Sequence, residues 1–116
     1  GLRANEDHDL ALRLVLAGIE VHFESAAVVH YRYRRSARAL WKQGLAYGTA
    51  RPLVWRRVRD AGLPAPSRFA GWRSWVWLVV HLVALRSREG RASWVWVAGN
   101  RLGQVRGSVR HRTVFL

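Results

Sequence analysis

The sequence contains no cysteine and no methionine, and it has only seven acidic residues against twenty lysines and arginines. Without cysteine, neither a disulfide framework nor a cysteine-ligated zinc site can form. Because methionine is absent and the chain begins with Gly1, we expect it to be a piece of a longer protein, so the lack of a signal peptide says little. Half of the 116 residues are hydrophobic, which suits one folded domain and excludes a disordered chain.

A long hydrophobic run is also missing. The longest apolar segment, 74–85, has only Ser74 and His81 as polar members. Its twelve residues would cover about 18 Å as a helix, at about 1.5 Å per residue, whereas a bilayer core is about 30 Å thick. The segment therefore does not predict a simple transmembrane helix.

The charge is divided unevenly along the chain. Residues 1–31 carry two arginines and five acids, a net charge of −3, whereas residues 32–116 carry a net charge of +16. All seven tryptophans lie in the basic part. A basic, Trp-rich surface of this kind attracts polyanions, either nucleic acid or anionic lipid.

Three acids, Glu6, Asp7 and Asp9, stand directly before an apolar segment with helical spacing that ends at Ala17-Gly18. The acids in front and the glycine behind predict a short helix. For any single Asp, capping of the helix N-terminus, worth about 0.5–2 kcal/mol, is a sufficient explanation. A helix cap needs only one such residue, whereas here three like charges lie within one turn. Such crowding raises carboxyl pKa values, and it is tolerated where a catalytic base or a metal site needs it.

Two short strands are expected after this helix. Residues 19–23 alternate apolar and polar side chains with period two, and residues 27–31 form a β-branched run after a turn at 24–26. Both patterns are typical of strands.

Helices are expected in the rest of the chain. Ser36 is a typical cap for a helix over residues 37–47, which Gly48 would break, and Pro52 fits the first turn of another helix that runs to about residue 61. Residues 62–67 are rich in Gly and Pro and predict a linker.

Several elements follow one another in the first half of the chain: Glu6-Asp7-x-Asp9-Leu10-x-x-Arg13-Leu14, Ala17-Gly18, a strand, Ala27-Val28-Val29-His30 and Tyr33-x-x-Ser36. In this order they resemble the catalytic end of family 2 glycosyltransferases of the GT-A fold. The resemblance covers about residues 1–50 and becomes loose after Pro52. It implies an α/β fragment, the C-terminal portion of a GT-A domain, over residues 1–50. A mainly α-helical, basic, Trp-rich extension is then expected over residues 51–116.

The resemblance also implies an activity, the inverting transfer of a sugar from a nucleotide-diphosphate sugar to a hydroxyl of a glycan or lipid-linked acceptor. Asp7 would be the general base that takes the hydroxyl proton, a role that typically contributes about 10²–10⁴-fold. Glu6 would lie beside the acceptor, and Asp9 would orient the loop or cap the helix. Arg13 matches a family position, where a structural ion pair is as good an explanation as a chemical role.

His30 has two interpretations. A lone histidine at a strand end is usually structural, but in some GT-A enzymes a histidine here completes a divalent metal site. His30 follows Asp7 by 23 positions, which fits such a site. The metal, Mg²⁺ or Mn²⁺, would act as a Lewis acid on the departing diphosphate. Most of its ligands would come from an upstream Asp-x-Asp motif, which Asp7-x-Asp9 is not.

The chain departs from the family pattern in two ways. It has no Gly-rich or βαβ nucleotide-binding half, so the donor would bind a missing N-terminal portion, and we expect the 116 residues alone to be inactive. It also lacks Gln-x-x-Arg-Trp, the signature of processive polysaccharide synthases in this family, which favours a non-processive enzyme.

A basic cluster follows His30 and comprises Arg32, Arg34, Arg35 and Arg38. It is either a solvated face or a surface that receives a phosphate-bearing acceptor or anionic lipid, where each basic residue is worth about 1 kcal/mol. Because indoles suit a membrane interface, we expect peripheral or re-entrant attachment to the cytoplasmic face of the plasma membrane.

Two alternatives without catalysis stay open. A nucleic-acid-binding module would explain charge and aromatics, but no zinc-finger or RRM signature is present, so no specific nucleic acid is expected. A membrane scaffold would explain the basic part but would need no Glu-Asp pair.

Overall fold

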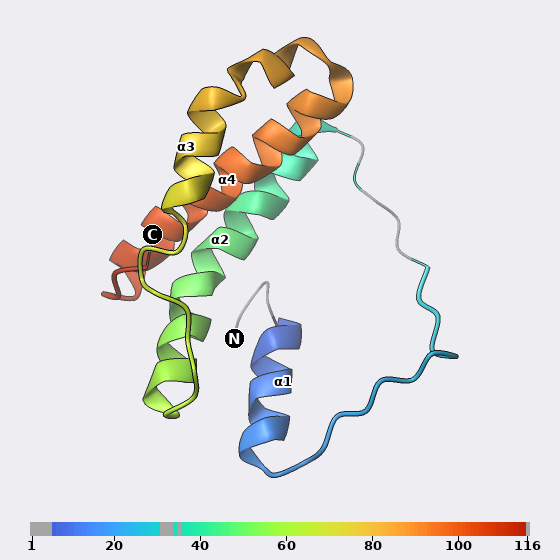
Figure 1. Ribbon diagram of the computed structural model, residues 1–116, viewed down its shortest axis with the longest axis vertical. Helices are drawn as coiled ribbons and strands as arrows, with labels where there is room; N and C mark the ends of the chain where they lie inside the picture. Colours follow the sequence, from blue (N-terminus) through green and yellow to red (C-terminus); the bar gives the residue numbers. More distant parts are fainter. Residues whose placement is uncertain (1–5, 31–33, 35, 116) are drawn as a thin grey trace.

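The computed structural model describes residues 6–30, 34 and 36–115. These residues form the helices α1 (Glu6–Leu16), α2 (Ala37–Asp60), α3 (Trp72–Val80) and α4 (Arg88–Arg110), with a 3₁₀ helix, η1 (Leu82–Arg86), before α4. No strand occurs in this described part of the chain (Figure 1). The expectation of an α/β fragment is therefore wrong, and the described protein is helical.

The two expected strands are replaced by irregular backbone from residue 19 to residue 30. Their apolar side chains are exposed, and Phe23 is 94% accessible to solvent. Figure 1 shows this segment running outside the helices. A strand is held by hydrogen bonds to a neighbouring strand, and the described residues supply none. Tyr31, at the end of the second expected strand, lies outside the described residues.

The expected end of α1 is confirmed. Gly18 has a φ of +70°, and the N–H of Ile19 donates to the carbonyl of Leu14 at 2.9 Å. Glycine adopts this left-handed conformation without the steric cost that a side chain would bring. The turn that ends α1 is therefore set by residues 14–19 alone.

The start of α2 is also as expected, because the N–H of Ala39 donates to the Ser36 hydroxyl at 3.2 Å. The expected break at Gly48 and restart at Pro52 are wrong. α2 is one helix of 24 residues that continues without a break through both positions. The reason lies in its partner, α4.

Helices α2 and α4 lie side by side and run in the same direction (Figure 1). Glycines spaced four residues apart face each other along the seam, Gly44 and Gly48 from α2 and Gly99, Gly103 and Gly107 from α4. A Cβ atom at Gly44 would lie 2.5 Å from the carbonyl oxygen of Trp96, and one at Gly99 would lie 2.8 Å from that of Trp41. The two backbones are therefore in direct contact.

This glycine seam explains why α2 is continuous. A glycine inside a helix costs about 1 kcal/mol relative to alanine, but here it admits close packing between the helices. Pro52 is fully buried. Its ring crowds the carbonyl of the residue four positions earlier, which is Gly48. Tertiary packing thus overrides two local signals for a helix break.

The remaining elements pack around the seam. α3 lies against α4, where the indole N–H of Trp94 donates to the carbonyl of Leu78 at 3.0 Å. After α4 the tail folds back, and the ring of Phe115 lies 5.3 Å from that of Trp55. No helix among the described residues is both long enough and apolar enough to span a bilayer.

We predict that Gly48→Ala will destabilise the fold. Its added methyl would overlap the carbonyl oxygen of Asn100, and a backbone atom cannot swing aside as a side chain can. The free energy of unfolding should fall by about 1–3 kcal/mol or more, although alanine raises helix propensity. Urea denaturation followed by circular dichroism measures this, with Ala46→Leu on the exposed side of α2 as the control. Unchanged stability in Gly48→Ala would contradict direct backbone contact between α2 and α4 at this glycine.

Candidate functional site

Glu6 and Asp7 lie in the first turn of α1 and are exposed. The side chain of Asp7 is 71% accessible, and its Oδ1 accepts a hydrogen bond of 3.1 Å from Nδ1 of His8. This hydrogen bond is the main cause that lowers the pKa of Asp7 below its usual value. Asp7 is therefore an open carboxylate that is ionised at neutral pH.

Asp9 is in a different position, with only 13% of its side chain accessible. It accepts hydrogen bonds from Arg13, whose Nε lies at 3.1 Å, and from Nη1 of Arg57 on α2. Burial of Asp9 opposes its ionisation, but the hydrogen bond and charge of Arg57, aided by Arg13, outweigh it and lower the pKa. Asp9 thus ties α1 to α2.

Crowding of the three acids was expected to raise carboxyl pKa values, and for Asp7 and Asp9 this is wrong. Each carboxylate points to its own donor, His8 in one case and two arginines in the other. A donor at hydrogen-bond distance stabilises the charged form more than a like charge along the helix destabilises it. Asp9 serves structure, and Asp7 remains open.

A cavity of about 450 Å³ lies next to this site, and we call it the Asn100 cavity. His8 forms part of its wall, as do the polar residues Tyr47, Arg51 and Asn100. The rest of the wall is apolar or aromatic: Val54, Trp55, Val58, Pro66, Trp96 and Phe115. Since His8 also bonds to Asp7, the open carboxylate is one hydrogen bond away from the cavity wall.

Buried polar groups stand beside Asn100 on α4. Arg101 and Gln104 are only 6% and 1% accessible. Arg101 donates from Nη2 to Oδ1 of Asn100 at 3.3 Å, while its Nη1 and both amide atoms of Gln104 have no partner in the described part of the chain. Burial, and then the charge of Arg51, lower the pKa of Arg101. A buried cation without a carboxylate partner is costly and gives this region a positive potential.

His30 is exposed in the irregular segment, and the described residues bring no three histidines or acids together as a metal site. A ligand role for His30 stays a prediction. Of the basic cluster, Arg34 and Arg38 are exposed. Arg32 and Arg35 lie outside the described residues.

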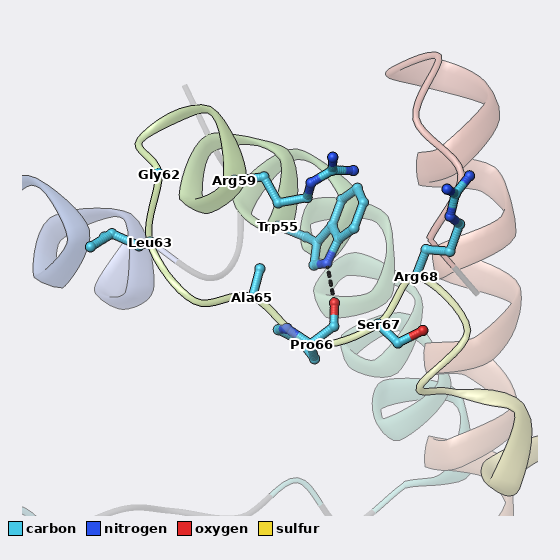
Figure 2. Close-up of a pocket in the computed structure, with 8 residues that line it drawn as sticks. All are labelled: Trp55, Arg59, Gly62, Leu63, Ala65, Pro66, Ser67 and Arg68. Atoms are coloured by element: carbon cyan, nitrogen blue, oxygen red, sulfur yellow. Dashed lines mark hydrogen bonds between the residues drawn. The ribbon is translucent and has the colours of Figure 1, made fainter.

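A second hollow, the Trp55 pocket, has a volume of about 490 Å³ and lies where α2 meets the loop after it (Figure 2). The indole N–H of Trp55 donates to the carbonyl of Pro66 at 2.7 Å, and the guanidinium of Arg59 lies 4.8 Å from the centre of the indole ring. Ser67 and Arg68 complete the polar part of the wall. Sequence reasoning did not find this pocket. The four-residue spacing of Trp55 and Arg59, close to a Gly-Pro loop, was the available signal.

Comparison of the chain with protein-family models, curated proteins and solved structures finds no match.

We predict that acid will detach α1 from α2. Because the pKa of Asp9 is lower in the fold than its ordinary value of 3.8, its ion pairs stabilise docking above that pH and are lost as the pH falls below it. Hydrogen-exchange protection of α1 amides should drop below about pH 4, and Asp9→Asn should show the same loss at pH 7. Glu20→Gln, at an exposed position, is the control. Full protection of the α1 amides in Asp9→Asn would contradict the docking of α1 on α2 through Asp9.

Proposed function

We propose that the chain supplies the acceptor side of a glycosyltransferase that moves a sugar, with inversion, from a nucleotide-diphosphate sugar to a hydroxyl. The single observation that carries the proposal is the separation of roles at the start of α1. Asp9 is occupied by Arg13 and Arg57, whereas Asp7 is exposed, ionised and hydrogen-bonded to the side chain of His8, which lines the Asn100 cavity. The motif resemblance implies that the general base would be this same aspartate.

The Asn100 cavity suits an acceptor that has both apolar and polar parts. Its volume falls within the range of about 300–1,000 Å³ that is usual for ligand pockets. Trp96 and the other aromatic residues can pack against a sugar ring or a lipid chain, while Tyr47, Arg51 and Asn100 can bind hydroxyls or a phosphate. A lipid-linked sugar has these features.

In the reaction, the Asp7 carboxylate takes the proton of the acceptor hydroxyl as that oxygen attacks the anomeric carbon, and the bond to the diphosphate breaks. A carboxylate of low pKa is a weak base, but it is fully charged at neutral pH and holds the hydroxyl in line. His8 orients it. The donor, with a divalent metal that would offset the charge of the diphosphate, would bind a part of the enzyme other than these residues.

We predict that Asp7→Asn, in the enzyme that carries this chain, will lower kcat by about 10²–10⁴-fold and leave donor affinity unchanged. The amide keeps the shape but cannot accept the proton. Single-turnover kinetics with donor and acceptor measure the first effect, and donor titration measures the second. Comparable turnover in Asp7→Asn would remove Asp7 from the base role.

Two variants serve as controls for this experiment. Glu6→Gln removes a neighbouring charge without touching the proposed base and should raise the acceptor KM more than it lowers kcat. His8→Ala removes the hydrogen bond that lowers the pKa of Asp7, so the acid limb of the pH–rate profile should move to higher pH. A general loss of folding would lower activity without this shift.

A second function, attachment to an anionic membrane surface, is favoured by the outer face of α3 and η1. This face exposes a run of large apolar side chains that comprises Phe69, Trp72, Val76, Val79, Val80, Leu82 and Val83. Exposed arginines flank it at positions 68, 73, 86 and 88. A helix with an apolar outer face and a basic border is typical of interfacial binding.

We predict that the chain will co-sediment with vesicles that contain anionic lipid and much less with neutral vesicles. Val79→Ser/Val83→Ser should weaken the partition by about tenfold or more, since burying one valine is worth about 1.5–3 kcal/mol. Val28→Ser/Val29→Ser removes two valines that are at least as exposed but lie outside this face, and it is the matched control. Equal losses in the two variants, or no preference for anionic vesicles, would contradict attachment through α3 and η1.

A further inference from the structure

We infer that the Trp55 pocket is a binding site for the phosphate group of an organic phosphate ester. The pocket is formed by the last turns of α2 and the loop that follows, and it brings Arg59, Ser67 and Arg68 to one hollow beside the Trp55 indole (Figure 2). No acid lines it among the described residues. Its polar groups are thus two cations and one hydroxyl.

Both guanidinium groups lie over aromatic rings, and neither pairs with a carboxylate of the described residues. Arg59 lies over Trp55 at 4.8 Å, and Arg68 lies over Phe69 at 5.8 Å. None of the ion pairs in the described chain involves either arginine. A stacked guanidinium keeps its N–H groups free and loses less entropy on binding than a free one does. Each of these groups can donate hydrogen bonds to the oxygens of a phosphate.

The end of α2 does not repel an anion here as an open helix C-terminus would. Its last carbonyls accept hydrogen bonds from the loop, where the N–H groups of Ala61, Gly62 and Leu63 donate to residues 57, 59 and 58 at 3.0, 2.9 and 3.1 Å. Gly62 makes this turn possible because its φ is +72°. The hydroxyl of Ser67 accepts from the N–H of Phe69 at 3.3 Å, which leaves its own proton available to a ligand.

The size of the pocket and its walls limit the ligand class. A volume of about 490 Å³ exceeds what a bare phosphate needs, and Leu63, Ala65 and Pro66 add an apolar side to the wall. A phosphomonoester with a small organic group fits both parts. Such a group can come from a soluble ester or from a lipid headgroup, because Phe69, which holds Arg68, also belongs to the exposed apolar face.

This site does not depend on the proposed base. Asp7 is not part of the wall of the Trp55 pocket, so Asp7→Asn should leave phosphate binding unchanged. Loss of catalysis and loss of phosphate binding can therefore be observed separately.

The experiment follows the assigned indole N–H resonance of Trp55 in the ¹⁵N-labelled 116-residue chain at about 0.15 M salt, where distant charges are screened. The two probes carry the same phosphomonoester. One is glycerol 3-phosphate, and the other is phosphatidic acid in phosphatidylcholine bicelles, with phosphatidylcholine bicelles alone as the blank. Trp55→Phe identifies the resonance.

We expect a saturable shift of the Trp55 resonance. Arg59→Gln/Arg68→Gln should weaken binding by about tenfold or more, whereas Arg91→Gln/Arg106→Gln, with the same charge loss at exposed positions outside the pocket and the apolar face, should leave it unchanged. Arg59→Lys keeps the charge and should give an intermediate loss. A shift with glycerol 3-phosphate identifies a soluble ester as sufficient, and a shift only with phosphatidic acid identifies a lipid headgroup. No saturable shift with either probe, or equal weakening in the two double variants, would overturn the inference.

Discussion

The direct contact between the backbones of α2 and α4 is the constraint on which the rest of the structure depends. Glycines along the seam let two parallel helices meet without intervening side chains, and a carbonyl of one helix lies where a Cβ of the other would be. Such contacts allow little sliding, so the register of α4 on α2 is fixed. That register places Trp96 and Asn100 opposite Tyr47 and Arg51 and so forms the Asn100 cavity.

Trp55 is the second point on which several elements converge. Its ring contacts Phe115 of the tail, its N–H binds the carbonyl of Pro66, and Arg59 lies over its face. The same indole lines both the Asn100 cavity and the Trp55 pocket. One buried side chain therefore holds the loop and the tail on α2, and it separates a mainly apolar cavity from a basic pocket.

The third feature is the distribution of charged side chains over the molecule. Among the ion pairs of the described residues, only that between Asp9 and Arg57 joins the acidic start of the chain to its basic remainder. Most of the other arginines are exposed and face solvent. The positive charge of the protein is therefore available to external anions, which agrees with the proposed phosphate site and with the proposed contact to an anionic bilayer. Asp7 is an exposed carboxylate whose hydrogen-bonded neighbour, His8, lines the Asn100 cavity.

The sequence by itself determined the features that act within a few residues: the end of α1 at Gly18, the Ser36 cap and the loop after α2. Only the tertiary structure decided the rest. Gly48 and Pro52 continue a helix because α4 packs on them, the segment from 19 to 30 forms no strand without a neighbour, and Asp9 finds Arg57 at a distance of 48 positions. The physical reason is that capping and turn geometry are local, whereas burial, ion pairing and strand formation need a partner whose position the fold alone sets.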